Sequence, residues 1–454
     1  MMLNFKSFEN VLFLVVSAYS KLVWSHKGNK AATNGSGKTP DQFSNWSKSV
    51  IRIPVFGQID NVMFVSYNGV VLFPNQIFFI QTHRQTMKDQ FQIRRDKLRH
   101  LIKKDGLGGI LITSFVNVTY LTGFSGDDSF LLVTKEGDTI LSDFRYTEQI
   151  GQECPNLTAY IRPVEESMAK ATKKLLKGVT PKRLGVEGDS MTLSQRDTFA
   201  GTLDDWEPAT TSGLVERLRM IKDHSEIELM RKAGVAAARA FECLKAGLRA
   251  EQTEIQLKNQ LDHAMKEFGA ERTAFSSIAA VGPWASLCHA VPGDRRVAEG
   301  ELLLIDWGAV CKGYMSDNTR TIITTHKPSN KLRKLYDIVL KAHLEAMAAI
   351  KPGVRCCDID AIARGIISDA GYGKYFGHGL GHGLGLEIHE NPRFNTITET
   401  LLEPGMVMTV EPGIYLPGWG GIRIEDDFLV TKTGYENITP RLPKDFESMV
   451  AMVD

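Results

Sequence analysis

The residue types best suited to chemistry gather between positions 376 and 392, in the stretch FGHGLGHGLGLEIHENP. His378 and His382 are four residues apart, which is the spacing of a metal-binding pair on a helix. Five interior glycines would each cost a helix about 1 kcal/mol relative to alanine, so we expect an extended segment with both histidines pointing the same way. His389 ends the run and lies an odd number of residues from both, so in an extended segment its side chain would point the other way. Because three of the chain's eleven histidines fall within twelve residues, we interpret the stretch as part of a site rather than as a glycine-rich loop with incidental histidines.

Two acidic residues occupy matching ends of a predicted hairpin. Asp306 closes the apolar run ELLLID, and Asp317 follows a turn centred on residues 311–313. This hairpin would place the two aspartates opposite each other, with Cβ atoms about 4.5–5.5 Å apart. Two carboxylates at that separation repel each other unless a cation or a proton lies between them.

The same arrangement recurs further along the chain. Glu411 ends the run MVMTVE, Glu425 lies in GIRIED, and residues 418–420 form the centre of the turn between them. A single hairpin with two acidic residues opposite each other is readily explained as the solvent-exposed edge of a sheet. Two such hairpins, each with an apolar strand leading into an acid, favour a buried metal site over surface charge.

Four carboxylates and one histidine form a hard, oxygen-rich ligand set. Bridging carboxylates favour two divalent ions such as Mn²⁺, with Co²⁺ or Zn²⁺ as alternatives, whereas structural zinc would prefer thiolates. Two ions about 3.5–4 Å apart can hold a bridging hydroxide and polarise a carbonyl group. The residues themselves therefore indicate metal-assisted hydrolysis.

Composition limits the class of protein. The chain of 454 residues has room for more than one domain, and its 43% hydrophobic and 24% charged residues are typical of a soluble globular protein. Lysine and arginine total 54 against 53 aspartates and glutamates, so no global basic field indicates nucleic acid. The six cysteines are scattered without CxxC spacing, which favours reduced thiols in a cytoplasmic protein.

The first 86 residues differ in character from the rest. Residues 11–19 are apolar but short, and Glu9 disrupts the charged start of a signal peptide. Residues 26–49 have the composition of a disordered linker. Residues 62–80 are apolar, but asparagine, glycine and proline interrupt them, which argues against a spanning helix. We expect an extension outside the fold, either disordered or the product of a misassigned start, with a membrane anchor as the less favoured alternative.

From Met87 the pattern alternates strands with helices, which indicates an α/β domain that ends near residue 215. It opens with an amphipathic helix, MKDQFQIRRDKLRHLIKKDGL. We expect strands at 107–113, 129–134, 138–143 and 183–187 and a helix at 166–177. A second domain would begin with a charged helix at 216–234, followed by helices at 235–247 and 253–268.

The chain resembles the pita-bread metallopeptidases, the family of methionine aminopeptidase, aminopeptidase P and prolidase. The resemblance is carried by SLCHAVPGDR, LLLIDWGAVCKGYMSDNTRT, FGHGLGHGLGLEIHE, LEPGMVMTVEPGIY and GIRIEDDFLVT. NVTYLTGFSG resembles the amino-terminal domain of aminopeptidase P, prolidase and creatinase, which methionine aminopeptidases lack. The resemblance therefore implies a creatinase-like α/β domain over 87–215 and an α+β pita-bread catalytic domain over 216–454, with no counterpart for residues 1–86.

The resemblance also implies how two metal ions would be held. Asp306 would chelate one ion, and Asp317 would bridge both. His382 and Glu411 would bind the other ion, and Glu425 would form the second bridge. All five positions carry the residue that the family requires.

Further residues are implied to act on the substrate. His289, His378 and His389 would line the site and contact the substrate or the tetrahedral intermediate. Arg423 would lie beside the bridging glutamate and contribute to substrate binding. Glu411 would also carry a proton to the leaving nitrogen.

The implied activity is hydrolysis of the bond between an amino-terminal residue and proline by a hydroxide held between two metal ions. The sequence leaves open whether dipeptides or longer peptides are preferred. We expect small peptides with proline in the second position as substrates, a homodimer, and no nucleic-acid or membrane partner. The alternatives are a creatinase-like hydrolase of non-peptide C–N bonds and a non-catalytic binding protein on the same fold, and the complete ligand set counts against both.

Overall fold

The computed structural model describes residues 66–67, 70–73, 76–79, 89–439, 442–451 and 453. The chain divides into two units, Met1–Thr86 and Met87–Asp454. In the first unit the described residues form an antiparallel sheet of β1 (Ser66–Tyr67), β2 (Val70–Phe73) and β3 (Gln76–Phe79), in that order. The described part of the apolar segment 62–80 is therefore β-strand and not helix. The apolar run 11–19 and the linker predicted at 26–49 lie outside the described residues, and no helix within the described ranges is long and apolar enough to cross a bilayer.

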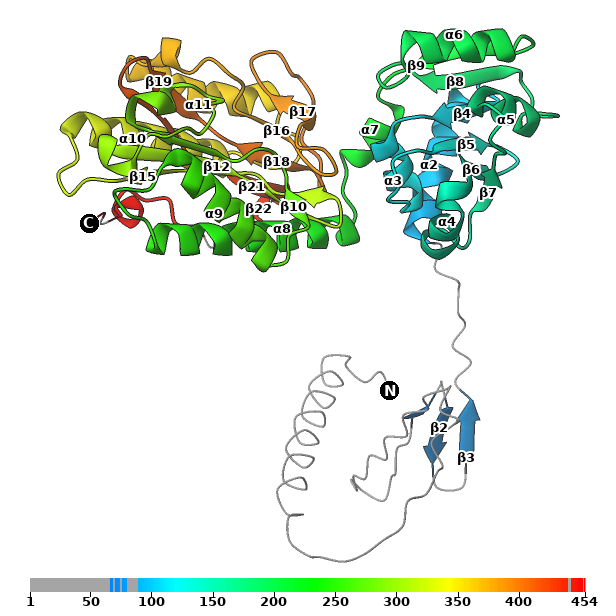
Figure 1. The fold of residues 1–454 in the computed structure, drawn as a ribbon, viewed down its shortest axis with the longest axis horizontal. Helices are drawn as coiled ribbons and strands as arrows, with labels where there is room; N and C mark the ends of the chain where they lie inside the picture. The colour runs from blue at the N-terminus through cyan, green and yellow to red at the C-terminus, as the bar shows by residue number, and fades with distance from the viewer. Residues whose placement is uncertain are drawn as a thin grey trace, which may run out of the picture. The chain divides into compact units, whose positions relative to one another are not determined.

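The second unit begins with a six-stranded mixed sheet, in the order β7-β6-β5-β4-β8-β9, with helices packed on it (Figure 1). Its elements are α2 (Gln90–Lys104), β4 (Gly109–Ile112), α3 (Phe115–Thr122), β5 (Phe130–Thr134), β6 (Asp138–Ser142), α4 (Thr147–Glu153), β7 (Thr158–Ile161), α5 (Met168–Leu175), β8 (Arg183–Glu187), α6 (Leu193–Thr202) and β9 (Glu207–Thr211). Ile110 of the central strand β4 shares a core cluster with Leu98 of α2, whereas its neighbour Leu111 shares another with Phe199 of α6. Because side chains alternate along a strand, burial of both faces requires helices on each side of the sheet. The four predicted strands are confirmed.

The helices that follow have different limits from those predicted. A short helix, α7 (Leu214–Arg219), ends before α8 (His224–Ala246) begins, and α8 runs without a break through residue 235. The Asp223 side chain accepts a hydrogen bond from the Glu226 amide, and the Glu226 side chain accepts one from the Asp223 amide. This capping box starts a new helix at a point where hydrophobic periodicity alone predicted a continuous one.

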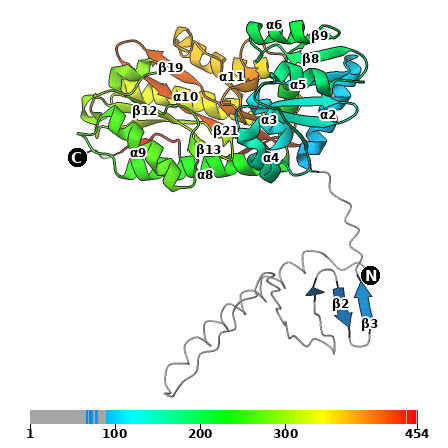
Figure 2. The ribbon, with the colours of Figure 1, turned by 45° about the vertical axis from the view of Figure 1, so that its right-hand side comes forward.

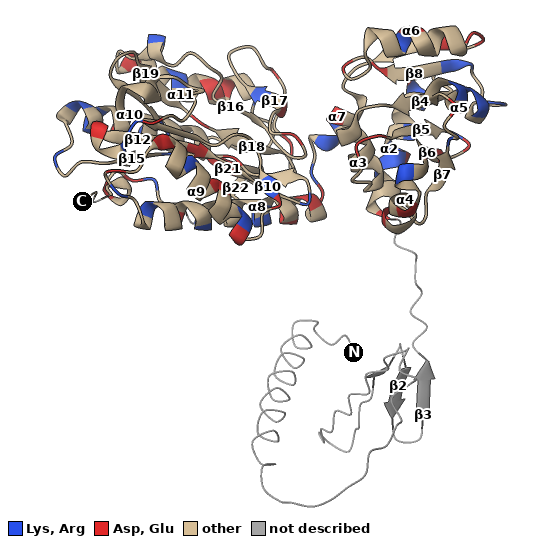
Figure 3. Ribbon diagram, in the orientation of Figure 1, with Lys and Arg blue, Asp and Glu red and all other residues tan. Residues whose placement is uncertain are grey.

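The remaining strands form a second group of sheets between two pairs of helices. The elements are α9 (Glu254–Glu267), β10 (Arg272–Thr273), β11 (Ile278–Val281), β12 (Leu302–Trp307), β13 (Ala309–Cys311), β14 (Tyr314–Met315), β15 (Asn318–Ile323), α10 (Asn330–Ala348), α11 (Cys356–Asp369), β16 (Gly381–Gly383), β17 (Glu390–Phe394), β18 (Val407–Val410), β19 (Gly413–Leu416), β20 (Gly420–Arg423), β21 (Asp426–Val430) and β22 (Tyr435–Asn437). The sheet orders are β11-β12-β15, β17-β16-β18-β21-β22, β19-β20 and β10-β13-β14. Helices α8 and α9 lie on one side of these strands, and α10 and α11 lie on the other (Figure 2). Acidic residues lie among the strands as well as on the helices (Figure 3).

The first acidic hairpin differs from the prediction in its register. Strands β12 and β15 pair so that Asp306 faces Thr319 rather than Asp317. Lys312 and Gly313 both have positive φ, 47° and 82°, as a two-residue hairpin turn requires. The turn is therefore centred between these two residues, and the paired positions differ from those predicted. Asp317 lies two residues before Thr319, so its side chain points to the same face of the sheet. It is therefore a diagonal neighbour of Asp306.

The register of the second acidic hairpin is confirmed. Val410 pairs with Asp426 at the end of the β18–β21 ladder. Gly413 pairs with Arg423 in the β19–β20 ladder. Both pairs have the same register, which sets residue 411 opposite residue 425 in the gap between the two ladders.

Candidate metal centre

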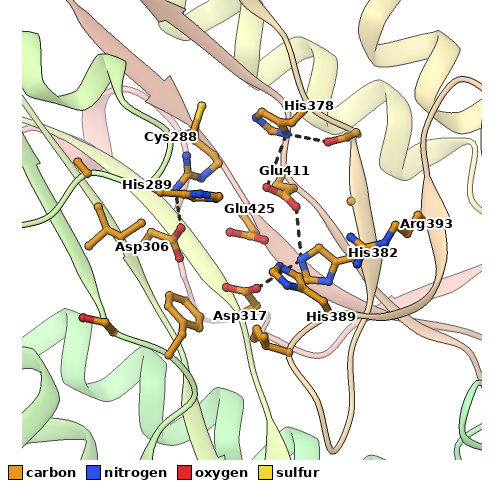
Figure 4. A pocket seen from close by; sticks show the side chains of 18 of the residues that line it. Cys288, His289, Asp306, Asp317, His378, His382, His389, Arg393, Glu411 and Glu425 are labelled. Atoms are coloured by element: carbon orange, nitrogen blue, oxygen red, sulfur yellow. Dashed lines mark hydrogen bonds and ion pairs between the residues drawn. The ribbon is translucent and has the colours of Figure 1, made fainter. Parts of the chain in front are cut away.

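A cavity of about 660 Å³ lies where these strands converge. Figure 4 shows the carboxylates of Asp306, Asp317, Glu411 and Glu425 pointing toward one centre, with the ring of His382 beside them. All nine residues singled out from the sequence line the cavity: His289, Asp306, Asp317, His378, His382, His389, Glu411, Arg423 and Glu425. The structure therefore brings the two hairpins and the histidine-rich stretch to one place.

Glycine allows the strand that carries His382 to lie between two neighbours. A Cβ at Gly381 would come within 2.1 Å of the Thr409 carbonyl oxygen, and one at Gly383 within 2.5 Å of the Asn391 carbonyl oxygen. The predicted extended, glycine-lined segment is confirmed for these three residues of β16. Residues 376–380 before it form neither helix nor strand.

The hydrogen bonds of His382 fix which ring nitrogen faces the carboxylates. Its Nδ1 lies 3.0 Å from the carbonyl oxygen of Gly383, which can only accept, so Nδ1 carries the proton. Burial lowers the pKa of His382 to about 3, so the ring is neutral. Its Nε2 lies 3.5 Å from Oε1 of Glu411 and 3.7 Å from Oδ2 of Asp317. A lone pair therefore points into the carboxylate cluster, as it does in a metal-ligating histidine.

The buried carboxylates lie close enough to repel one another, and a cation between them would stabilise their charged forms. Burial raises the pKa of Asp317, Glu411 and Glu425, and neighbouring carboxylates raise each of them further. Ligand atoms of Asp317, His382 and Glu425 lie within 4.8 Å of one another. Oδ1 of Asp306 is buried and accepts no hydrogen bond from a described residue. A divalent cation would relieve the repulsion and give this oxygen a partner, so the residues fit metal binding.

Arg423 connects the two acidic hairpins. Its Nη2 donates to Oδ2 of Asp306 at 2.5 Å, and its Nε donates to Oγ1 of Thr319 at 2.9 Å. The Thr319 hydroxyl donates in turn to Oε2 of Glu425 at 2.6 Å. The guanidinium therefore orients one carboxylate directly and a second one through a threonine.

The other three histidines differ in their surroundings. His378 is half-buried, with Nδ1 2.8 Å from the Gly379 carbonyl oxygen and Nε2 2.9 Å from the Tyr415 hydroxyl. The exposed His389 stacks edge-on against His382, with ring centroids 4.5 Å apart. His289 is exposed and lines the cavity. Protein atoms thus satisfy both ring nitrogens of His378, whereas His289 and His389 face the open space.

Sequence reasoning missed several residues that line or support the site. Tyr415 and Thr319 contact Arg423, and Cys288 and Arg393 line the cavity. Strand parity could have indicated two of them, because Tyr415 shares the parity of Glu411 and Thr319 shares that of Asp317. Nothing in the sequence pattern distinguishes Arg393 from other charged residues near the end of the histidine-rich stretch.

Comparison with known sequences finds similarity over most of the chain. The model of metallopeptidase family M24 matches residues 228–432, and that of the creatinase/prolidase N-terminal domain matches residues 94–221. An uncharacterized peptidase of Bacillus subtilis is 39% identical over 347 residues, which are 76% of this chain and 98% of the relative. An Xaa-Pro dipeptidase of Pyrococcus horikoshii is 36% identical over 352 residues, 76% of this chain and 97% of the relative.

Solved structures give the same result. An Xaa-Pro dipeptidase from Bacillus anthracis has a TM-score of 0.75 and 38% identity, covering 79% of this chain and 99% of its own. An X-Pro aminopeptidase from Thermotoga maritima has a TM-score of 0.72 and 33% identity, covering 79% of this chain and 100% of its own. The predicted fold class, an α/β amino-terminal part followed by an α+β pita-bread part, is confirmed.

Proposed function

The chain belongs to metallopeptidase family M24 and is a hydrolase, and we propose that it cleaves the bond between an amino-terminal residue and a following proline. The relatives named Xaa-Pro dipeptidase and X-Pro aminopeptidase support this substrate class. An Xaa–Pro bond is a tertiary amide with a ring-locked φ, which distinguishes it from other peptide bonds and requires a dedicated pocket. Dipeptides and longer peptides both have this bond.

The proposed cofactor is a pair of divalent ions, with Mn²⁺ preferred and Co²⁺ or Zn²⁺ as alternatives. Asp306 would chelate one ion, and His382 would bind the other through Nε2. Asp317 and Glu425 would bridge the two, and Glu411 would complete the second site. When bound, such ions lower the pKa of a water molecule and polarise the scissile carbonyl.

The remaining residues would act on the substrate itself. His389 faces the cavity and would donate a hydrogen bond to the oxyanion that develops at the scissile carbonyl, and His289, which also faces the cavity, would hold the substrate. His378 would contact the substrate by exchanging one of its two protein hydrogen bonds for it. Glu411 would transfer a proton to the leaving nitrogen. Arg423 would contribute to substrate binding and would hold Asp306 and Thr319 in orientation.

The observation that carries the proposal is the Nε2 lone pair of His382, which points into a buried cluster of four carboxylates in a peptide-sized cavity. The test is to strip the purified chain with a chelator, measure bound metal, and assay Ala-Pro and Ala-Pro-Ala before and after adding Mn²⁺, Co²⁺ or Zn²⁺. We expect no turnover without metal and best recovery with Mn²⁺ or Co²⁺. Asp317→Asn should lose more activity than Asp306→Asn, because a bridge serves both ions.

The same assay separates the alternatives. Full turnover in metal-free protein would disprove the two-metal mechanism. Hydrolysis of creatine without peptide cleavage would favour the creatinase-like activity, and peptide binding without cleavage would favour a binding protein.

We also propose a homodimer in the cytoplasm, with small peptides as partners and no nucleic acid. All six cysteines lie within the described residues and are free, which supports a reducing compartment. Light scattering on the purified chain and imaging of a tagged chain in cells test these two points.

A further inference from the structure

The segment Phe376–Leu380 carries His378 but belongs to neither a helix nor a strand. Its backbone groups therefore need partners outside a regular ladder. Helix α11 provides them. Arg364 donates to the carbonyl oxygens of Phe376 at 2.9 Å and of His378 at 2.8 Å. Asp360 accepts a hydrogen bond from the Leu380 amide at 3.1 Å.

Asp360 and Arg364 also hold each other in place. They are one turn apart on α11 and form two parallel hydrogen bonds, Nε to Oδ2 at 2.7 Å and Nη2 to Oδ1 at 2.8 Å. The Asp360 side chain is fully buried, and that of Arg364 is 26% exposed. The guanidinium lies over the Phe376 ring, 4.4 Å from its centroid. The planar guanidinium of arginine has fixed donor directions, so it can hold a carboxylate and two carbonyl groups at once. We call this pair of residues the Asp360–Arg364 clamp.

The clamp lies directly behind the site. Between the two carbonyl groups that Arg364 binds, the chain turns so that the His378 ring meets the Phe376 ring edge-on, with centroids 5.1 Å apart. The carbonyl of Leu380, whose amide Asp360 holds, accepts a hydrogen bond from the Glu411 amide at 2.8 Å. The clamp is thus bonded to the backbone on both sides of His378.

We propose that Asp360 and Arg364 are positioning residues that fix the ring of His378 against Tyr415 in the active site. Neither residue lines the cavity, so neither can touch substrate. The inference rests on the proposed function for its kinetic consequence, but the placement of the ring can be observed without any activity.

The first part of the test is kinetic and uses the full chain loaded with Mn²⁺ and the substrate Ala-Pro. The variants are Arg364→Ala, Arg364→Lys, His378→Ala, and Arg364→Ala combined with His378→Ala. Arg355→Ala is the matched control, because Arg355 precedes the same helix and forms an exposed ion pair with Asp358. We expect Arg364→Ala to lower kcat about tenfold or more, with metal content unchanged, because small displacements of an active-site group are costly. The double variant should be no slower than His378→Ala, and the control should match the natural chain.

The second part is structural. Lysine at position 364 keeps the charge opposite Asp360 and so preserves folding, but its three donors on one nitrogen cannot replace the four hydrogen bonds that the planar guanidinium makes. In a crystal structure of Arg364→Lys we expect the distance from His378 Nε2 to the Tyr415 hydroxyl to exceed 3.5 Å, compared with 2.9 Å here. An unchanged distance would overturn the proposal. The proposal would also be overturned if the fall in kcat of the double variant equalled the product of the falls in the two single variants. A fall in kcat that accompanies a fall in metal content or in Tm would overturn it as well. If the natural chain does not cleave Ala-Pro, the proposed function fails, and the distance alone decides the role of the clamp.

Discussion

The hydroxyl of Tyr415 donates a hydrogen bond to Nε2 of His378 across 2.9 Å. The direction follows from the other ring nitrogen, because Nδ1 lies 2.8 Å from the Gly379 carbonyl oxygen and must donate to it. Arg423 donates to the Tyr415 oxygen at 2.7 Å, and burial raises the pKa of the phenol, which therefore keeps its proton. The same arginine binds Asp306, so His378 is joined to a candidate metal ligand through two buried side chains.

Replacing Tyr415 tests this connection. Tyr415→Phe leaves a buried acceptor on His378 and a buried donor on Arg423 unpaired, which costs about 1–3 kcal/mol. We expect kcat/KM to fall by about one to two orders of magnitude for this cost, with metal content unchanged. Tyr336→Phe is the control, because its buried hydroxyl donates to the Lys444 carbonyl oxygen instead. That control should lower Tm but not turnover, and equal turnover in both variants would contradict the role of Tyr415.

The two acidic hairpins show how much of the site the sequence could predict. The pairing of Glu411 with Glu425 was predicted correctly, although the turn lies at residues 417–419 and not at 418–420, since Leu416 pairs with Gly420. The pairing of Asp306 with Asp317 was wrong, because the positive φ of Lys312 cannot be foreseen from its residue type. A register error of two residues leaves each side chain on the same face of the sheet. Asp317 therefore still lies on the same face as Asp306.

Contacts made by long side chains were beyond sequence reasoning. Arg423 reaches Asp306 and Thr319 from a different strand, and the pattern gives no direction for its guanidinium. The same holds for Arg364, which lies on a helix and holds backbone carbonyls around His378. The predicted extended segment forms a strand only at Gly381–Gly383, because the carbonyl groups of Phe376 and His378 bond to helix α11 and not to a neighbouring strand.

Acid stability should depend on Glu390. Burial would raise its pKa, but Lys222 and Arg219 lower it to about 2, against an ordinary value of 4.5. The folded chain therefore binds this proton less readily than the unfolded chain, so the stabilisation is complete above about pH 4.5 and is lost as the pH falls toward 2. The difference corresponds to about 3 kcal/mol. Glu390→Gln should lower the free energy of unfolding at pH 7 and flatten its decline below pH 4.5, as measured by urea titration.

The neighbouring Glu387 provides the control for that measurement. It also pairs with Arg219 at 2.7 Å, but its side chain is 51% exposed. Exposed ion pairs contribute little, so Glu387→Gln should follow the natural chain at every pH. Parallel acid curves for the natural chain and Glu390→Gln would show that Glu390 is not the responsible group.

Arg393 should decide how the site treats a free carboxylate. It lines the cavity, is exposed, and forms no ion pair with a described residue (Figure 4). In an Xaa-Pro dipeptide the carboxylate belongs to the proline itself, so an arginine in this cavity can bind it. Arg393→Leu should raise KM for Ala-Pro about tenfold, because hydrogen bonds to charged groups contribute about 1.5–3 kcal/mol. KM for Ala-Pro amide, which lacks the charge, should not change, and an equal rise for both substrates would refute the assignment.

The predicted domain limits at Met87 and near residue 215 stay predictions. All nine candidate residues and the clamp lie between residues 87 and 454. A chain that begins at Met87 should therefore fold and retain turnover of Ala-Pro. Circular dichroism, Tm and kcat of the shortened chain measure this, with the full chain as reference. Insoluble or inactive protein would place residues 1–86 in the core or in an interface.

The last prediction separates a metal-binding histidine from one that acts on the substrate. His382→Ala removes the Nε2 lone pair from the carboxylate cluster, so bound metal and activity should fall together. His389→Ala should keep the metal and lower kcat by about 10²–10³, the usual cost of losing one donor to a developing oxyanion. His289→Ala should keep the metal as well, with a rise in KM if it holds the substrate before reaction. Metal analysis and steady-state kinetics on Ala-Pro measure all three, and His263→Ala, an exposed residue of α9 outside the cavity, is the control. Loss of metal in His389→Ala together with retention in His382→Ala would reverse the assignment, because the ring that faces the open cavity would then be the ligand.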